Sequence, residues 1–304
     1  MRKGLASSTL RTYDFAWFTF AMFCVSICMP LKPVNINTVC AFICYCKDVR
    51  HFKTQYICGL VSGIQFNIRC YDPSFPSLFS NSAIKTLFKG ISKSSPPALD
   101  HRQHITLSLL HRMLSVLRNG VFSSYIDTML EAVFLLAFYA FLRSGEFTTP
   151  SKIFDPNRDL SFSDLAFHPS HFTLRLKHSK CGGACSVVVA RTDSTYCPHR
   201  SMVKYLHIRP NFGPLSPLFL IQGNFPLSKN WFNHHFRQVL INSGLSPQLY
   251  SGHSFRIAAA TSAANQGIST ASLQQLGRWS SSAYTSYIRP DVNTVLANQR
   301  LLKP

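Results

Sequence analysis

Apolar residues recur at helical spacing through the first part of the chain. Between residues 8 and 92 they return every three or four positions, which is the period of an amphipathic helix. Loop-forming and proline residues interrupt this pattern, so we expect separate helices at about residues 8–28, 35–47, 53–67 and 80–92. Short helices of this kind pack as a small bundle, and residues 1–92 are therefore interpreted as one helical domain.

The first of these helices is more apolar than a surface helix needs to be. Residues 15–29 are almost wholly apolar. A bilayer span takes about 20 such residues, so this run is too short for one, and no clear small-residue cleavage site indicates a signal peptide. We expect a buried helix whose inward stripe consists of Leu10, Tyr13, Trp17, Phe20, Cys24 and Ile27.

A basic, proline-containing linker follows at residues 93–104. Beyond it, Thr106 is a candidate cap for a helix with one apolar face, and residues 125–141 are apolar on nearly every side. A helix that is apolar all round is normally buried. Residues 125–141 are therefore expected to form the central helix of a second domain, residues 105–304.

The apolar period changes to that of β-strands between residues 160 and 190. Alternating and β-branched positions predict short antiparallel strands at 160–167, 171–177 and 186–190. Helical patterns return at 198–208, 228–244, 253–267 and 269–276, and Asp291 is a candidate cap for a last amphipathic helix carrying Val292, Val295, Leu296 and Leu301. The expected fold class is mainly α with a small antiparallel β-sheet, an α+β arrangement in two domains.

The charge balance indicates a partner that is dense in phosphate. The 304 residues include 31 Lys and Arg against 12 Asp and Glu, which gives a net charge of +19. Neutralising phosphates releases counterions and supplies affinity that does not depend on sequence. A membrane surface is the competing interpretation, but the basic residues are spread along the whole chain, which favours a long groove for nucleic acid and no membrane partner.

The ten cysteines indicate a reducing, intracellular compartment, because no paired CxxC motif is present and several lie in apolar sequence. A zinc site built from Cys181, Cys185, Cys197 and His199 is the weaker alternative, since the first two flank an expected hairpin turn. We expect no metal and no other cofactor.

The most informative stretch lies near the end of the chain. His253 and Arg256 stand three residues apart where a helix is expected to begin, and the N-terminus of a helix favours an anion. Leu276-Gly277-Arg278-Trp279 follows after a short helical interval, and Tyr287 is expected on another helix. An imidazole, a guanidinium, an indole or second guanidinium, and a phenol together make a set suited to phosphate.

These motifs resemble the catalytic domain of the tyrosine recombinases, the phage integrase family. The Gly-Arg-Trp motif is similar to that in the recombinases of DIRS-type retrotransposons and cryptons. The resemblance extends upstream to Arg143, directly after the apolar helix, and to Lys180 on the expected hairpin. It covers residues 100–290 well and 8–92 weakly, and it implies that the first domain is a core-binding (SAM-like) DNA-binding domain and that residues 105–304 are the catalytic domain.

The resemblance also implies roles. Tyr287 would attack a DNA phosphodiester and form a 3′-phosphotyrosine, while Arg143 and Arg256 stabilise the charge on the phosphate. Lys180 would protonate the leaving group, with Lys177 as the alternative donor, and His253 would act as general acid–base. The charge on these side chains replaces a metal ion. Glu146 is expected to orient a neighbour.

One departure from the family pattern leaves two candidates open. The family usually places His or Trp after the glycine of the Leu-Gly motif, whereas Arg278 stands there and Trp279 comes next. An indole N–H donates one hydrogen bond, as a histidine would, so Trp279 is favoured over Arg278. Tyr284 is a second candidate nucleophile, behind Tyr287.

The function expected from the resemblance is site-specific DNA recombination or integration, of mobile-element origin, by a homo-tetramer assembled on double-stranded DNA in the nucleus. The alternatives are a catalytically inactive, domesticated recombinase fold that only binds DNA, and a type IB topoisomerase-like relaxase.

Overall fold

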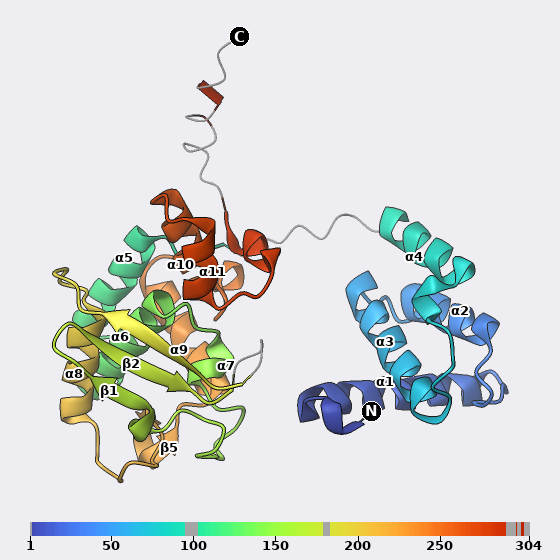
Figure 1. Ribbon diagram of the computed structural model, residues 1–304, viewed down its shortest axis with the longest axis horizontal. Helices are drawn as coiled ribbons and strands as arrows, with labels where there is room; N and C mark the ends of the chain where they lie inside the picture. The colour runs from blue at the N-terminus through green and yellow to red at the C-terminus, as the bar shows by residue number, and fades with distance from the viewer. Residues whose placement is uncertain (1, 95–102, 179–182, 290–295, 297–298, 301–304) are drawn as a thin grey trace. The chain divides into compact units, whose positions relative to one another are not determined.

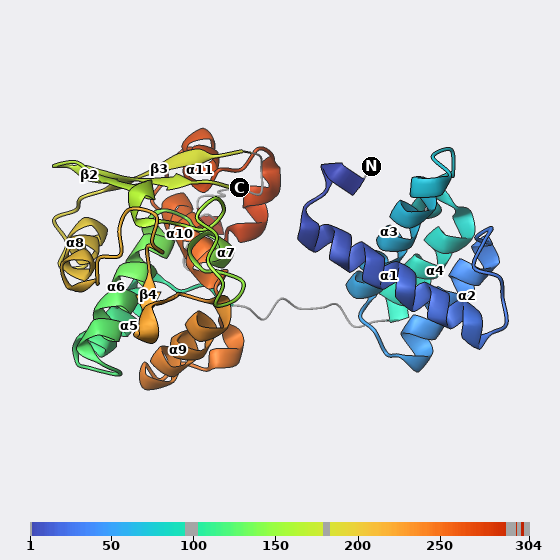
Figure 2. The same cartoon turned by 90° about the horizontal axis from the view of Figure 1, so that it is seen from below.

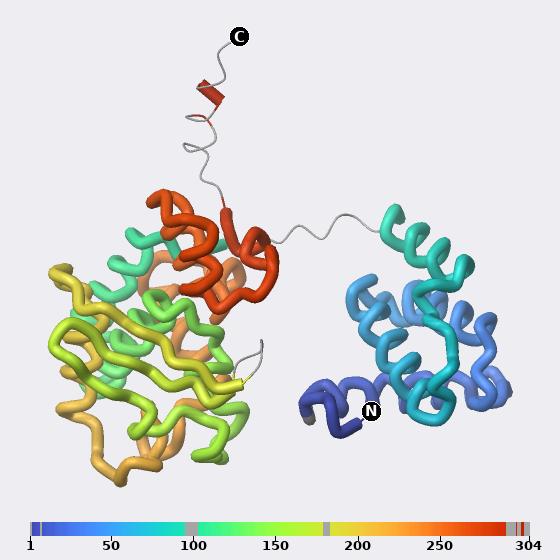
Figure 3. The backbone as a smooth tube through the Cα atoms, in the orientation of Figure 1, coloured from blue at the N-terminus to red at the C-terminus, as the bar shows by residue number. Residues whose placement is uncertain are grey.

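The computed structural model describes residues 2–94, 103–178, 183–289, 296 and 299–300. The chain divides into two compact units, Met1–Asp100 and His101–Pro304. No helix in the described ranges combines the length and the hydropathy that a membrane crossing requires. The backbone trace of each unit can be followed in Figure 3.

The first unit is a helical bundle (Figure 1). Its helices are α1 (Ser7–Ser26), α2 (Ile36–Cys44), which continues as a π-helical turn (Tyr45–Val49), α3 (Thr54–Tyr71) and α4 (Ser82–Ser94). Short 3-10 turns lie at Arg2–Gly4 and Leu78–Ser80. The core is formed by fully buried apolar side chains from all four helices, among them Ala16, Val39, Phe42, Ile43, Ile57, Val61, Ile64 and Ile84.

Local signals explain where these helices begin and how closely they pack. The side chain of Asn35 accepts a hydrogen bond from the backbone N–H of Asn37 at 2.8 Å and so caps α2. Helices α1 and α3 approach closely at Gly63, because a Cβ atom there would lie 2.6 Å from the Cβ of Ala16. Only glycine permits this contact.

The second unit is made of helices and a small antiparallel sheet. The helices are α5 (Leu107–Arg118), α6 (Ser124–Tyr139), α7 (Ser144–Phe147), α8 (Pro198–Ile208), α9 (Lys229–Asn242), α10 (Ser254–Asn265) and α11 (Thr270–Gly277). The strands are β1 (Leu165–Phe167), β2 (His171–Leu176) and β3 (Cys185–Ala190), antiparallel in the order β1-β2-β3, and the separate pair β4 (Leu220–Ile221) and β5 (Phe225–Pro226). Short 3-10 segments lie at Phe162–Asp164, Gln222–Asn224, Pro247–Leu249 and Ser282–Tyr287.

Helix α6 is the centre of the second unit, and its residues from Ile126 to Phe138 are all buried. Figure 2 shows the three-stranded sheet on one side of α6 and α9 on the other. Two carboxylates are buried on α6 and have partners: Asp127 accepts the backbone N–H of Phe122 at 3.2 Å, and Glu131 pairs with Arg118 at 2.6 Å. Burial raises the pKa of Asp127, and its backbone partners oppose this shift.

The structure differs from the sequence-based expectations in several details. Ile27, expected to face inward with the stripe of the first helix, is 40% exposed. The pair β4–β5 was not predicted, because strands of two residues leave no readable period. Tyr287 ends a 3-10 segment rather than the expected α-helix. The side-chain hydroxyls of Thr285 and Ser286 each donate a hydrogen bond to the backbone carbonyl three residues earlier, which competes with α-helical pairing.

Two further expectations concern residues that the structure describes only in part. The helix expected from Asp291 lies almost wholly outside the described residues. Of the alternative zinc ligands, Cys181 is also outside them. Cys197 instead accepts the backbone N–H of Thr192 at 3.2 Å, and His199 Nε2 lies 3.1 Å from the carbonyl oxygen of His168.

Candidate active site

Arg143 lies at the junction between α6 and α7. The chain turns sharply after α6, where Phe141 has a left-handed φ of 51°, and Arg143 then caps α7. Its backbone N–H donates to Glu146 Oε2 at 2.8 Å and its Nη1 donates to Glu146 Oε1 at 3.0 Å. Two contacts to one carboxylate fix both the backbone and the side chain of Arg143.

Arg256 lies in the first turn of α10 and is completely buried, with 0% of its surface exposed. Its Nη1 donates to the carbonyl of Phe141 and its Nη2 to the carbonyl of Gly277. A guanidinium has five N–H donors, so these two bonds leave others free for a ligand. Burial, followed by the like charges of Arg143 and Arg278, lowers the pKa of Arg256 to about 10.

Glu146 holds two of the three arginines in the cluster. Its Oε1 accepts from Arg143 at 3.0 Å and its Oε2 accepts from Arg278 at 2.9 Å. One carboxylate therefore faces three guanidiniums, and the cluster keeps a surplus of positive charge. The expectation that Glu146 orients a neighbour matches these contacts.

Arg278 and Trp279 take different positions. Arg278 has a left-handed φ of 54° at the end of α11, and its Nη1 donates to the carbonyl of Ala140 at 2.9 Å. This guanidinium therefore ties α11 to the end of α6 and to Glu146. Trp279 instead lies over Arg256, with 4.3 Å between the guanidinium carbon and the ring centroid.

Gly277 makes the position of the indole possible. A Cβ atom at residue 277 would overlap the ring of Trp279, at 1.6 Å from its nearest atom. The indole is 8% exposed, and its Nε1 has no partner in the part of the chain that the structure describes. Sequence reasoning placed the glycine in the motif but did not predict that the indole covers it.

Tyr287 completes the cluster. Its ring lies 5.2 Å from that of Trp279 and 5.5 Å from the guanidinium carbon of Arg256. The hydroxyl of Thr261, on α10, donates to the carbonyl of Tyr287 at 3.2 Å and accepts the backbone N–H of Arg289 at 3.0 Å. Helix α10 thus carries Arg256 and also anchors the segment of Tyr287. Tyr284 lies farther from Trp279, at 6.3 Å between ring centroids.

His253 is the cap residue of α10, as the sequence predicts, and is exposed. The preceding Gly252 packs directly on α7, because a Cβ atom there would lie 2.7 Å from the Cβ of Ser144. This contact brings the turn that carries His253 beside the residue that follows Arg143.

Of the two candidate lysines, the structure describes the surroundings of Lys177 only. Lys177 Nζ is enclosed by oxygen atoms: Asp164 Oδ2 at 2.6 Å, Ser161 Oγ at 2.7 Å, and the carbonyls of Pro156 at 2.6 Å and Asp159 at 2.9 Å. All its donor capacity is used within the fold, so Lys177 is poorly placed to act on a ligand. Lys180 lies outside the described residues.

Buried N–H groups without a partner gather in this cluster. Among the described residues, they include Nε of Arg256, Nε of Arg278 and Nε1 of Trp279. Buried donors are nearly always paired, and a group of them beside surplus positive charge is the arrangement that accepts an anion. The site therefore has the chemistry of an oxyanion site with a phenol at its edge.

The sequence model of the phage integrase family matches residues 110–293. This chain belongs to the phage integrase family. The match covers the whole cluster from Arg143 to Tyr287. Comparison with curated protein sequences finds no match.

Solved structures of low sequence identity share the family fold. XerH site-specific recombinase bound to a palindromic difH substrate aligns with a TM-score of 0.68 and 14% identity, over 96% of this chain and 79% of XerH. The Tn1549 transposon integrase in complex with transposon right-end DNA aligns with a TM-score of 0.67 and 13% identity, over 99% of this chain and 95% of the integrase. A lambda integrase dimer bound to a core site aligns with a TM-score of 0.60 and 16% identity, over 94% of this chain and 73% of the lambda integrase chain.

Proposed function

We propose that this phage integrase family member is a site-specific DNA recombinase that breaks and rejoins strands through a 3′-phosphotyrosine. The observation that carries the proposal is the position of the Tyr287 ring beside Arg256, Trp279 and their unpartnered N–H groups. A phosphodiester bound to those donors would present its phosphorus to the phenol.

The reaction needs no external energy source. The Tyr287 oxygen attacks phosphorus, the bond from phosphorus to the 5′-oxygen breaks, and one phosphodiester is exchanged for another. We assign the stabilisation of charge on the non-bridging oxygens to Arg143 and Arg256, with Trp279 donating one further hydrogen bond. His253 accepts the phenol proton, and Lys180 gives a proton to the departing 5′-oxygen.

Arg278 is the less suitable of the two candidates after Gly277. Its guanidinium already bonds to Glu146 and to the carbonyl of Ala140, whereas the Trp279 indole faces Arg256 and Tyr287. We therefore keep Trp279 as the phosphate contact and assign Arg278 to holding the site together. Because fixed cations already supply the positive charge, we expect strand cleavage to persist in EDTA.

The experiment is covalent capture on a nicked suicide DNA substrate, compared between Tyr287→Phe and Tyr284→Phe. We expect Tyr287→Phe to abolish the protein–DNA adduct and to leave DNA binding intact, because only the nucleophilic oxygen is lost. Tyr284→Phe is the matched control and should retain the adduct. The reverse pattern would move the nucleophile to Tyr284, and no adduct from the wild-type chain would favour the inactive DNA-binding alternative.

Finer assignments belong to the same proposal. The Gly277-Arg278-Trp279 motif supports an origin in a mobile element of the DIRS or crypton type. A relaxase of the topoisomerase IB kind would form the same adduct but would not join two duplexes, so strand exchange between separate duplexes distinguishes the two. We propose that exchange takes place in a tetramer on DNA and, in a eukaryotic cell, in the nucleus.

A further inference from the structure

Helix α1 is apolar on two opposite faces, and only one of them is covered. Its inner face buries Ala16, Phe20, Phe23 and Cys24 against the bundle. Its outer face exposes Phe15 at 55%, Phe18 at 62%, Met22 at 53% and Val25 at 70% of their surfaces. These four residues, here called the outer stripe, are spaced three, four and three residues apart and so lie along one line of the helix.

The outer stripe is held toward the surface of the bundle. Gly63 brings α3 into contact with Ala16 on the inner face, and the side chain of Asn67 donates to the carbonyl of Tyr13 at 3.0 Å. These contacts prevent α1 from turning its outer face inward. Scattered apolar residues on a surface are ordinary, whereas an aligned row of large ones indicates a protein contact.

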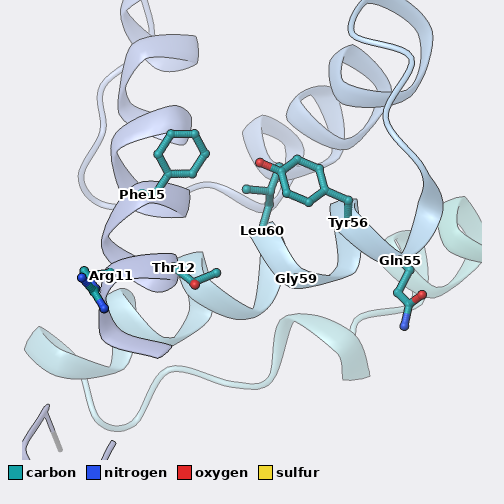
Figure 4. A pocket seen from close by; sticks show the side chains of 7 residues that line it. All are labelled: Arg11, Thr12, Phe15, Gln55, Tyr56, Gly59 and Leu60. Carbon is teal, nitrogen blue, oxygen red and sulfur yellow. The ribbon is translucent and has the colours of Figure 1, made fainter. Parts of the chain in front are cut away.

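A hollow beside the stripe adds to this surface. It has a volume of about 350 Å³ and lies between α1 and α3, with Phe15 and Tyr56 among its walls and Arg11 at its edge (Figure 4). Tyr56 is 45% exposed and widens the apolar surface next to Phe15. The hollow is suited to accept an apolar side chain from a second helix lying along α1.

We propose that the outer stripe binds the outer stripe of a second copy of this chain, with the two α1 helices antiparallel. In that arrangement Phe15 faces Val25 of the partner and Phe18 faces the partner's Met22, so that a large ring meets a smaller or more flexible side chain at every level. The contact is isologous, because each surface presents the same residues to the other.

The charges on α1 favour the antiparallel direction. Arg11 is exposed and has no hydrogen bond or ion pair among the described residues, and the last turn of α1 has no basic residue. An antiparallel partner brings Arg11 to the carbonyl end of the other helix, where the helix dipole is negative. A parallel partner would instead place Arg11 against Arg11.

The size of the surface indicates when the contact forms. The exposed parts of the stripe sum to on the order of 400 Å² per copy, given the area of large apolar side chains. A stable interface takes about 800 Å² per partner. The net charge of +19 further opposes association in solution. The contact should therefore be weak alone and form between copies on one duplex, a condition that rests on the proposed DNA binding.

The direct test is a photo-crosslink from the stripe. Phe18→p-benzoylphenylalanine places a reactive ring of similar shape on α1, and two differently tagged copies are irradiated on a random-sequence duplex long enough for both. We expect the crosslink to fall on Met22 or its neighbours in α1 of the other copy. Phe212→p-benzoylphenylalanine is the control, because Phe212 is 54% exposed on the second unit. Adducts elsewhere in the chain or on DNA, or no crosslink, would overturn the proposal.

A binding experiment measures the effect of the contact. The double variant Phe18→Ser, Met22→Ser should bind a short, single-copy duplex within about twofold of wild type, while the cooperative gain on a duplex of twice that length falls about tenfold or more. Ile153→Ser is the matched control, since Ile153 is 76% exposed on the second unit. Cooperativity that survives the double variant contradicts the contact.

A further arm separates this inference from the proposed function. If the wild-type chain binds neither duplex, the DNA-binding proposal fails, and the stripe is then tested without DNA. Crosslinking from residue 18 is repeated at high protein concentration in about 1 M salt, where the Debye length is about 3 Å and the net charge is screened. Crosslinks between α1 helices support the contact under those conditions, and their absence refutes it.

Discussion

At the scale of single residues, Arg256 is a cation that no solvent reaches. Burying a charge is costly unless it is paired, and two carbonyls with a nearby carboxylate compensate only part of that cost. A bound phosphate would bring the missing negative charge. Burial is the first cause of the lowered pKa of Arg256, and the second is the like charge of Arg143 and Arg278, which also underlies the proposed affinity for phosphate.

Gly277 provides the sharpest test at this scale. In Gly277→Ala the new methyl group overlaps the indole of Trp279, which must then leave its place over Arg256. We expect the rate of DNA cleavage to fall about a hundredfold, the usual effect of displacing a catalytic group by about 1 Å. Single-turnover cleavage of the suicide substrate measures it.

Gly145→Ala is the control for this change, because a Cβ atom at residue 145, beside Arg143 on α7, meets nothing within 4 Å. The control should cleave at the wild-type rate. Equal rates in all three proteins would mean that the position of the indole does not matter to the reaction.

At the scale of elements, helix boundaries could be predicted where capping side chains mark them. Thr106 accepts a backbone N–H at the start of α5, as expected. Ser228 and Ser269, the first residues of two expected helices, do the same for α9 and α11. The inward stripe predicted for α1 is buried at Phe20 and Cys24. The helix as a whole was expected to be buried, and the exposure of its outer face could not be predicted because residues 15–29 are almost wholly apolar. The order of the motifs located Arg143, Arg256 and Tyr287, but the carbonyl and carboxylate partners of the arginines depend on tertiary contacts.

The contact between α1 and α3 gives a prediction about stability. Gly63→Ala should lower the free energy of unfolding of the chain by about 1–3 kcal/mol, because the added methyl group meets Ala16 and the backbone of Tyr13. Gly59→Ala, four residues earlier on α3 and in open space, should instead raise it by about 0.5–1 kcal/mol. Urea unfolding followed by circular dichroism measures both variants, and similar values for the two would contradict the close approach at Gly63.

At the scale of the whole molecule, the charge of +19 should dominate affinity for DNA. If six or more phosphates are contacted, the logarithm of the binding constant should fall with the logarithm of the salt concentration at a slope of about −5 or steeper. Titrations of the full chain onto a short duplex between about 50 and 200 mM salt measure the slope. A slope near −1 would show that most of the basic residues do not contact DNA.

The hydroxyl of Thr261 bears on which copy in an assembly supplies the tyrosine to each site. It ties both sides of the Ile288 peptide to the helix that carries Arg256. The ring of Tyr287 is thereby kept beside the guanidinium of Arg256 in the same chain. With Tyr287 as the proposed nucleophile, we therefore expect each chain to cut with its own tyrosine, so that an assembly of several copies contains as many cutting centres as it has chains.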